Sequence, residues 1–404
     1  MRGDAGDTGC LNAQRTEVAI VGAGPAGLTL GRLLHRQGIE TVVLEARDRD
    51  YVEARIRAGV LEHGTVQTLR EAGVGDRLDR EGLVHGGIHV NVDGSRRHIP
   101  MAELTGRNVT IYGQTEVVKD LIDARCGDGA PLWFESRVDD VDGLEDATAV
   151  VRYADRDGRR HELHATYVAG CDGFHGVCRP AIPDQAQRSW EREYPFAWLG
   201  ILADVPPSTD ELIYAHHERG FALHSMRSTA VSRLYLQVAP DESLQRWPDD
   251  RIWEELAARL WTDGWTLRPG PILERSVTPM RSFVAAPMRY GSLLLAGDAA
   301  HIVPPTGAKG LNLAIGDVAL LAQALVERLR GGDASALDRY SDRCLERVWR
   351  AQHFSWWMTT MLHTDPDMSP YGRQLQRSQL RYLMSSRAAQ TSLAENYVGL
   401  PLRA

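Results

Sequence analysis

The sequence predicts a mixed α/β chain (α+β) with three parts: a βαβ unit, an antiparallel sheet and a C-terminal helical region. Three patterns support this prediction. A short alternating strand, a glycine-rich turn and an apolar helix follow one another over residues 17–34. Residues 190–280 contain period-two apolar stretches, and apolar residues recur every three or four positions over 311–361. Apolar residues at every second position are typical of strands, and apolar residues with a period of 3.6 are typical of helices. The spacing of the apolar residues therefore indicates which parts form strands and which form helices.

The βαβ unit carries a dinucleotide-binding pattern. Gly22, Gly24 and Gly27 have the spacing G-x-G-x-x-G between strand 17–21 and the helix, and Glu45 closes the next strand. The glycines allow a tight turn and the close approach of a pyrophosphate, while the acid suits a ribose hydroxyl. We therefore expect a Rossmann-like dinucleotide-binding domain rather than a merely structural turn.

A second strand, turn and helix lies at residues 292–329. Asp298 follows the apolar strand, and the helix begins near Leu311 and Asn312 and ends at Gly331. An acid at a strand end can accept hydrogen bonds from ribityl hydroxyls, and the N–H groups of a helix start favour negative charge. Because a reduced flavin is negative at one edge of its ring, flavin is the leading candidate. A structural βα unit is the alternative.

Length and composition exclude several classes of protein. A chain of 404 residues is too long for one core, so two or three domains are expected. The net charge of −8 argues against nucleic-acid binding, and no apolar run approaches the ~20 residues of a membrane span. The five cysteines include no C-x-x-C pair, which favours the reduced cytoplasm.

Asp172 follows another predicted strand, where we expect it to supply a second carboxylate near the cofactor. No metal site is expected around it. Cys171, Cys178 and His175 surround it, but their spacing fits no zinc pattern, so buried thiols are expected. The stretch 161–164 reads His-Glu-Leu-His within a strand pattern and is not a metal motif either.

Several residues leave two interpretations open. His85 is either a structural histidine or part of a proton relay. Ser225 and Arg227 share one strand face, where they either bind a carboxylate or form a polar edge, and the polar edge is the simpler interpretation. Arg47 and Arg49 either meet phosphates or lie on a solvated helix start, which their acidic neighbours favour.

These patterns divide the chain. Residues 1–16 form a polar tail, 17–187 together with 281–334 form the cofactor domain, 188–280 the antiparallel sheet, and 335–404 the helical region. In the last part, Phe354, Trp356, Trp357, Met358 and Met361 exceed one buried stripe, which favours a contact with a second subunit over burial in the monomer.

The three cofactor markers, at Gly22, Asp172 and Gly297, together resemble those of the single-component FAD-dependent aromatic hydroxylases. The similarity runs from Val18 to Pro401. It is greatest to the members that act on 4-hydroxybenzoate, in the blocks RIRAGVLEHG, YGQTEV, AGCDGFHG, YPFAWLG, RGFAL, GDAAHIVPPTGAKGLNLA, FSWWMT and AENYVGLP.

The resemblance implies a role for each matching residue. FAD contacts fall on Gly22, Gly24, Gly27, Glu45, Arg55, Arg57, Gln114, Asp172, Asp298, Leu311 and Asn312. Substrate contacts fall on Tyr214, Ser225, Arg227, Tyr235 and Pro305, which replaces the polar-edge interpretation of Ser225 and Arg227. Catalytic roles fall on Tyr214, Tyr397, His85 and Pro305, and contacts to NADPH or NADH fall on Arg57, His175, Arg179 and Arg281.

The implied activity is hydroxylation of 4-hydroxybenzoate ortho to its phenol, giving 3,4-dihydroxybenzoate, with NAD(P)H and O2. A Tyr-Tyr-His chain can move the phenol proton that this reaction requires. Two alternatives remain: hydroxylation of a substituted analogue such as 3-amino-4-hydroxybenzoate, and a non-catalytic flavin-binding scaffold. Ala46 stands where the family pattern has a basic residue, which leaves the choice between NADPH and NADH open. A cytoplasmic homodimer is expected.

Overall fold

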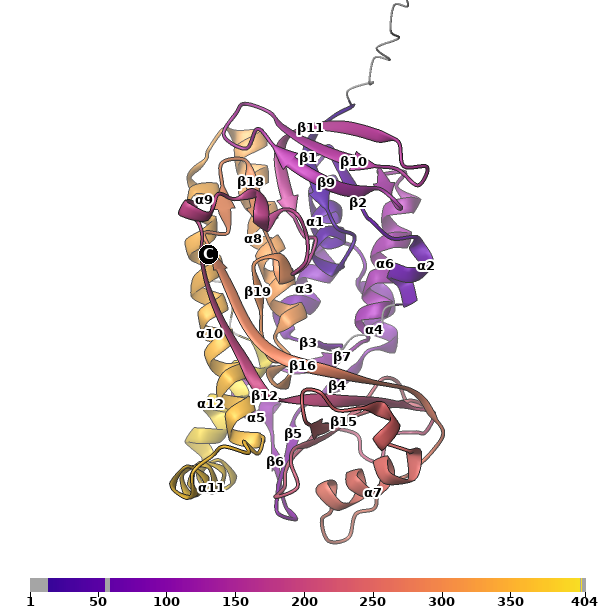
Figure 1. Cartoon of the computed structure of the whole chain (residues 1–404), viewed down its shortest axis with the longest axis vertical. Helices are drawn as coiled ribbons and strands as arrows, with labels where there is room; N and C mark the ends of the chain where they lie inside the picture. The colour runs from indigo at the N-terminus through magenta and orange to yellow at the C-terminus, as the bar shows by residue number, and fades with distance from the viewer. Residues whose placement is uncertain (1–13, 55–58, 400, 402–404) are drawn as a thin grey trace, which may run out of the picture.

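The computed structural model describes residues 14–54, 59–399 and 401. Figure 1 shows two regions stacked along the long axis, with a parallel sheet and its helices in one and an antiparallel sheet in the other. The long helix α10 (Tyr340–Leu362) runs along one side of the molecule (Figure 1). We call these regions the upper and the lower region, after their places in Figure 1.

The upper sheet is mostly parallel. Its strand order is β17-β18-β11-β1-β2-β8, with β10 beside β11 and β9 beside β10. β2 is buried at every position, as expected for a strand that is covered on both faces. The strands are β1 (Gln14–Val21), β2 (Thr41–Leu44), β8 (Leu132–Trp133), β9 (Arg137–Asp142), β10 (Ala149–Ala154), β11 (Arg160–Gly170), β17 (Arg289–Tyr290) and β18 (Leu293–Leu295).

Helices α1 and α8 share the main core of the upper region with these strands. α8 ends at Gly331, and Gly332 has a left-handed φ of 75°, as predicted for a glycine stop. The helices of this region are α1 (Pro25–His35), α2 (Arg49–Ala54), α3 (His63–Glu71), α4 (Gly75–Glu81), α6 (Gln114–Gly127) and α8 (Gly310–Gly331).

The lower sheet has the order β19-β16-β12-β15-β14-β13-β5-β6 and is antiparallel except between β13 and β5. β15 alternates between buried and half-buried positions, as its period-two sequence predicts. β5 and β6 join this sheet although they precede its other strands in sequence. The strands are β5 (Ile88–Val92), β6 (Ser95–Ile99), β12 (Arg188–Ala203), β13 (Ile213–His216), β14 (Ala222–Met226), β15 (Ser232–Val238), β16 (Ile272–Ala286) and β19 (His301–Ile302).

A small sheet of order β3-β7-β4 lies between the two larger ones (Figure 1). Its strands are β3 (Val60–Leu61), β4 (Leu83–His85) and β7 (Val109–Ile111). The remaining helices are α5 (Met101–Thr105), α7 (Asp249–Leu260), α9 (Ser335–Asp338), α11 (Pro370–Ser385) and α12 (Arg387–Val398).

The aromatic stretch of α10 is largely buried within the chain itself. Phe354, Met358 and Met361 are at most 3% exposed and belong to the core that also contains residues of β13 and α12. Trp357 packs partly against the same core, whereas Trp356 is 38% exposed. Burial in the monomer therefore accounts for most of the stretch that suggested a second subunit.

α8 is the helix within the described residues whose length and hydropathy would suit a membrane span. Of its most apolar window, 67% is buried inside the fold. Its apolar character is therefore explained by its place in the core of the upper region.

Candidate active site

The carboxyl ends of the central parallel strands lie in register. Val21 of β1 pairs with Gly170 of β11 and with Leu44 of β2, and Gly170 pairs with Leu295 of β18. Ligands of such sheets bind beyond this edge. The residues that emerge here are the predicted cofactor residues Gly22, Glu45, Asp172 and Asp298.

The glycine turn after β1 is packed too closely for side chains at two of its positions. Gly22 has a φ of +104°, and a Cβ there would lie 2.4 Å from the carbonyl oxygen of Cys171. A Cβ on Gly27 would lie 2.0 Å from the carbonyl oxygen of Gly22. A Cβ on Gly24 would meet no described atom within 4 Å, and no side chain caps α1 at this residue. The turn therefore offers open space and helix N–H groups to a pyrophosphate.

Glu45 and Asp172 are held by backbone N–H groups. The Glu45 carboxylate accepts hydrogen bonds from Ala23 N (2.8 Å) and Arg47 N (2.9 Å), which fixes it beside the glycine turn. Asp172 Oδ2 accepts from Cys178 N at 2.9 Å, while Oδ1 is buried with no described partner. Burial raises the pKa of Asp172. An orphaned carboxylate oxygen at this edge fits a hydroxyl-bearing cofactor.

Asp298 is exposed, and the turn that carries it is anchored by a buried pair that we did not predict. Asp317, on α8, accepts hydrogen bonds from Gly297 N (3.0 Å) and shares one with His301 Nε2 (2.6 Å). Both side chains are at most 1% exposed. Asp317 therefore holds the backbone next to Asp298, and its position in an otherwise apolar helix is the sequence signal for this role.

The start of α8 is tied to the small sheet by Asn312. Its amide accepts from Glu62 N (2.9 Å) and Thr65 Oγ1 (2.7 Å), and donates to Val60 O and Ala308 O. The Asn312 side chain is thus fully used within the protein, so only backbone N–H groups at Leu311 and its neighbours are offered to a ligand. No side chain caps α8 at its start.

Gln114 is the first residue of α6, and the guanidinium of Arg227 lies against this helix start. Arg227 Nη2 donates to Thr115 Oγ1 at 2.7 Å, and a Cβ on Gly113 would lie 2.5 Å from Arg227 Cζ. The cofactor side and the substrate side therefore meet at Gly113 and Gln114. The predicted cofactor residues Arg55 and Arg57 lie outside the described residues.

All five predicted substrate residues line one cavity of about 50 Å³ between the lower sheet and the small sheet. Tyr214, Leu223 and Tyr235 form a row across β13, β14 and β15, because each pairs with the next. The cavity is lined by Gly59, Val60, Ile111, Trp198, Leu212, Tyr214, Leu223, Ser225, Met226, Arg227, Arg233, Tyr235, Pro305 and Ala308.

The charged side of this cavity has two guanidinium groups rather than the one predicted. Ser225 lies two residues beyond Leu223, hence on the same strand face, and pairs across to Arg233. Arg233 Nε donates to Tyr235 Oη at 3.2 Å, and its Nη1 is buried with no described partner. Burial lowers the pKa of Arg227. Two half-buried cations beside a serine hydroxyl fit a carboxylate.

The phenolic side of the cavity is a hydrogen-bonded tyrosine pair. Tyr214 Oη lies 2.6 Å from Tyr397 Oη, and both residues are 1% exposed. Burial raises the pKa of both phenols, which favours their protonated, hydrogen-bonding form.

His85 is buried on β4, and no hydrogen bond joins it to either tyrosine among the described contacts. Its Nδ1 is buried without a described partner, and burial lowers its pKa. Its neighbour across the small sheet, Val109, belongs to the same core as Tyr397. An unpaired ring nitrogen in this core is suited to accept a proton through water.

Three predicted nicotinamide-donor residues surround Phe174. The guanidinium of Arg179 lies 4.6 Å and that of Arg281 5.1 Å from the centre of the Phe174 ring. The ring of His175 meets the same phenylalanine edge-on at 4.9 Å. The structure therefore brings His175, Arg179 and Arg281 into one basic and aromatic cluster.

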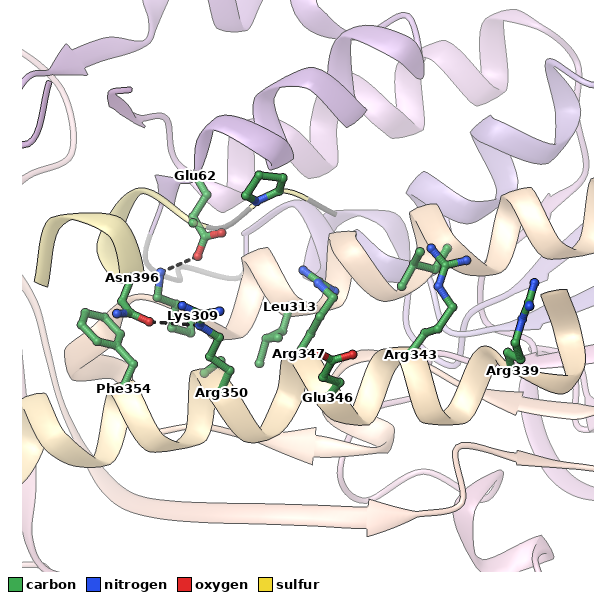
Figure 2. A pocket seen from close by; sticks show the side chains of 14 residues that line it. Glu62, Lys309, Leu313, Arg339, Arg343, Glu346, Arg347, Arg350, Phe354 and Asn396 are labelled. Atoms are coloured by element: carbon green, nitrogen blue, oxygen red, sulfur yellow. Dashed lines mark hydrogen bonds and ion pairs between the residues drawn. The ribbon is translucent and has the colours of Figure 1, made fainter. Parts of the chain in front are cut away.

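A larger cavity of about 550 Å³ lies beyond the start of α8 and beside α10. Figure 2 shows Arg343, Arg347 and Arg350 along α10, Arg339 just before its first residue, and Lys309 at the end where Arg350 lies. Lys309 is buried, pairs with Glu62 and donates to Tyr397 O at 3.0 Å. Burial lowers the pKa of Lys309. We did not predict this lysine, which joins the start of α8 to the tyrosine pair.

The sheets and the glycine turn define an FAD-binding protein, and the chain belongs to the family described as FAD binding domain, which it matches over residues 15–355. It is 49% identical over 393 residues to p-hydroxybenzoate hydroxylase of Acinetobacter baylyi, with 97% of each chain covered. The chain is accordingly an FAD-dependent aromatic monooxygenase. The scaffold alternative is set aside.

More distant proteins have the same fold. The 3-(3-hydroxy-phenyl)propionate/3-hydroxycinnamic acid hydroxylase of Mycobacterium avium is 30% identical over 354 residues, which span 80% of this chain and 57% of that protein. Among solved structures, p-nitrophenol 4-monooxygenase of Pseudomonas putida superposes with a TM-score of 0.82 at 20% identity, covering 96% of this chain and 99% of that one. The predicted fold is confirmed.

Proposed function

We propose that the chain hydroxylates 4-hydroxybenzoate ortho to its phenol and forms 3,4-dihydroxybenzoate, with O2 and a nicotinamide donor as co-substrates. The supporting observation is that one cavity has Tyr214, the partner of Tyr397, in one cross-strand row and Ser225, Arg227 and Arg233 in or next to the following row. Rows two residues apart on a strand are about 7 Å apart. This spacing suits an acid and a phenol in para positions on one ring. The 49% identity to p-hydroxybenzoate hydroxylase supports the same substrate.

FAD, when bound, supplies the oxygen-activating redox chemistry. Gly22, Gly24, Gly27, Glu45, Asp172, Asp298 and the backbone at Leu311 would hold it, since the packed glycines and the orphaned Asp172 oxygen fit such a group. At the substrate, Arg227 and Ser225 hold the carboxylate, and Tyr214 accepts the phenol's hydrogen bond. Tyr397 passes the proton on from Tyr214 towards His85. The phenol must lose this proton because the ring carbon of a phenolate is a better nucleophile than that of a phenol. Pro305 and Tyr235 close the cavity against water.

The assay compares aromatic acids that each lack one anchoring feature. Flavin-loaded protein receives NADPH or NADH with 4-hydroxybenzoate, 3-amino-4-hydroxybenzoate, benzoate or 4-hydroxybenzyl alcohol, and product is identified by mass. We expect 4-hydroxybenzoate to stimulate O2 uptake and to gain one oxygen. Benzoate, which lacks the phenol, should give no product. Product from the amino-substituted acid alone would replace the proposed substrate by that analogue.

For the donor, we propose that His175, Arg179 and Arg281 bind NADPH or NADH. Arg49 is not part of this proposal. It pairs with Glu53 and with Asp123, which supports its interpretation as part of a solvated helix start rather than as a phosphate contact. His175→Ala should raise the KM for the donor while leaving the KM for the aromatic acid unchanged. Comparing both donors in this variant also reveals which one the cluster prefers.

We also propose a homodimer and a cytoplasmic location. Trp349 and Trp356 lie two turns apart on α10 and are 44% and 38% exposed, and Trp190 packs edge-on against Trp349. Such exposed aromatic groups are typical of interfaces. The described cysteines are free thiols, which suits a reducing compartment. Light scattering should give twice the chain mass, and Trp349→Glu should give a monomer.

A further inference from the structure

Three side chains from separate segments meet on one face of the lower sheet, away from both cavities. His89 on β5 faces His98 on β6 as a direct cross-strand pair, with ring centres 5.0 Å apart. Glu211 lies just before β13, on the other side of β5. His98 Nε2 lies 2.7 Å from Glu211 Oε2, and one ligand atom from each residue lies within 4.8 Å of the other two.

The surrounding backbone holds this arrangement. Glu211 Oε1 accepts a hydrogen bond from Gly87 N at 2.7 Å, so one carboxylate oxygen is fixed and the other faces the imidazoles. A Cβ on Gly87 would lie 2.2 Å from His98 Nε2, so the glycine leaves room for this ring. His89 N donates to Leu212 O at 2.7 Å, which aligns the two strands that carry His89 and Glu211. Carboxylates that bind a metal are usually held by such a hydrogen bond.

We propose that His89, His98 and Glu211 form a binding site for a divalent transition-metal ion, with Zn²⁺ as the best match. Two imidazoles and one carboxylate are a ligand set that Zn²⁺ takes, with water in the remaining position. Zinc bonds of about 2.0–2.2 Å place tetrahedral ligand atoms about 3.3–3.6 Å apart. His98 Nε2 and Glu211 Oε2 are 2.7 Å apart, all three ligand atoms lie within 4.8 Å of one another, and the exposed His98 ring has room to adjust.

An ion here would join the β5–β6 hairpin to the segment that leads into β13, where Tyr214 lies. None of the three ligands is among the residues that line the two cavities described above. Metal binding is therefore independent of the proposed hydroxylation and is measured without turnover. The sequence did not predict this site, because His89 and Glu211 are far apart along the chain.

The test measures Zn²⁺ retained by the flavin-loaded protein after equilibrium dialysis, in the wild type and in single variants. The matched control is His161→Asn, because His161 forms a similar ion pair with Asp155 (2.8 Å) that is not part of a described three-ligand group. We expect wild type and His161→Asn to retain one more ion per chain than His98→Asn. Loss of the ligand should weaken binding by at least about 100-fold.

Two further measurements could refute the assignment of His89, His98 and Glu211 as a metal site. Glu211→Gln keeps an oxygen for the Gly87 N–H but is a poor ligand, so it should lose the ion as His98→Asn does. Saturating Zn²⁺ should raise the Tm of wild type but not of His98→Asn, since an ion that binds only the folded state stabilises it. Equal Zn²⁺ retention by wild type and His98→Asn, or wild-type binding by Glu211→Gln, would overturn the proposal.

Discussion

The flavin edge of the upper region and the substrate cavity are built in opposite ways. At the flavin edge, backbone groups form the contact surface: the glycine turn, the uncapped start of α1 and the start of α8. In the cavity, side chains from β12, β13, β14 and β15 form much of it, and the tyrosine pair, of which Tyr214 lines the cavity, joins residues 183 positions apart. A site made of backbone depends on local sequence, whereas a site made of side chains depends on long-range packing.

This difference predicts two kinds of sensitivity to substitution. The flavin edge should fail through steric overlap with the backbone, with the loss of cofactor as the result. The cavity should tolerate substitutions structurally while losing one chemical function at a time. Substitutions at the two sites therefore distinguish the two kinds of construction.

Gly27→Ala should abolish FAD retention. Its Cβ would lie 2.0 Å from the Gly22 carbonyl oxygen, so the turn must distort. The matched variant is Gly24→Ala, whose Cβ meets no described atom within 4 Å and should change apoprotein stability by no more than about 1 kcal/mol. Gly24→Ala should still weaken FAD binding if the pyrophosphate occupies this space, as we propose. Flavin content and the Tm of the apoprotein distinguish the two, and normal flavin content in Gly27→Ala would contradict the backbone account.

Tyr214→Phe should reduce the rate of product formation by about 100-fold or more, because it removes the first hydroxyl of the proton relay. FAD content should remain that of the wild type. Tyr235→Phe is the control, since this residue lines the same cavity without belonging to the tyrosine pair. Single-turnover measurement of the aromatic product separates this step from flavin reduction. Equal rates in the two variants would remove the relay role from Tyr214.

Arg227→Ala should raise the KM for the aromatic acid by about tenfold or more, as loss of a charged bidentate contact does. Arg233 stays in the cavity, so part of the binding should remain. Arg233→Ala should act in the same direction, and the double variant should exceed either single one. Initial rates against 4-hydroxybenzoate concentration give the KM. An unchanged KM in Arg227→Ala would show that the carboxylate binds elsewhere.

The smallest effect concerns pH. Burial lowers the pKa of His363, beside the cavity wall, to about 3, from an ordinary value of 6.5. The folded state therefore keeps this ring neutral while the unfolded state takes up a proton. The stability that His363 contributes is complete above pH 6.5 and is lost as pH falls towards 3, by about 1.4 kcal/mol per pH unit at most.

Urea unfolding at pH 7.5 and pH 5.5 checks this expectation. His363→Gln should retain less of the pH dependence, because its amide can still accept the hydrogen bond of Trp198 Nε1 but does not titrate. Part of the dependence should persist through His224, which burial also holds at a pKa of about 4. His161→Gln, at a half-buried histidine in the upper region, is the control and should retain the wild-type dependence. Identical pH dependence in His363→Gln and wild type would contradict the prediction.

The grouping of the flavin markers at one sheet edge could be predicted from sequence because these markers are short and follow strands. G-x-G-x-x-G, Asp172 and Asp298 each stand directly after a strand, and parallel pairing brings them together. Helix α8 was likewise predicted from its period and its glycine stop, and β12, β13, β14 and β15 of the lower sheet from period two, whereas β16 and β19 were not predicted and β5 and β6 were not placed in this sheet. The Asp317 and His301 pair was not, because no local pattern shows which buried polar residues meet.

The cavity could be assigned only through the family resemblance. Alternation put Ser225 and Arg227 on one face but could not show whether that face was solvent or a cavity. Arg233 and Lys309 escaped prediction, because a lone charge in a strand or turn usually faces water. Phe354, Met358 and Met361 of α10 are not evidence for a second subunit, because they are buried in the monomer.

The long pair formed by β12 and β16 connects the two halves of the molecule mechanically. β12 pairs with β16 from Arg188 to Ala203, with an irregularity between Glu193 and Ala197. A hydrogen-bonded ribbon resists stretching but bends where its ladder is interrupted. We therefore expect the two regions to rotate about a hinge at this interruption, while the length of the β12–β16 ribbon stays constant. Opening to admit substrate would then change an angle rather than separate the halves.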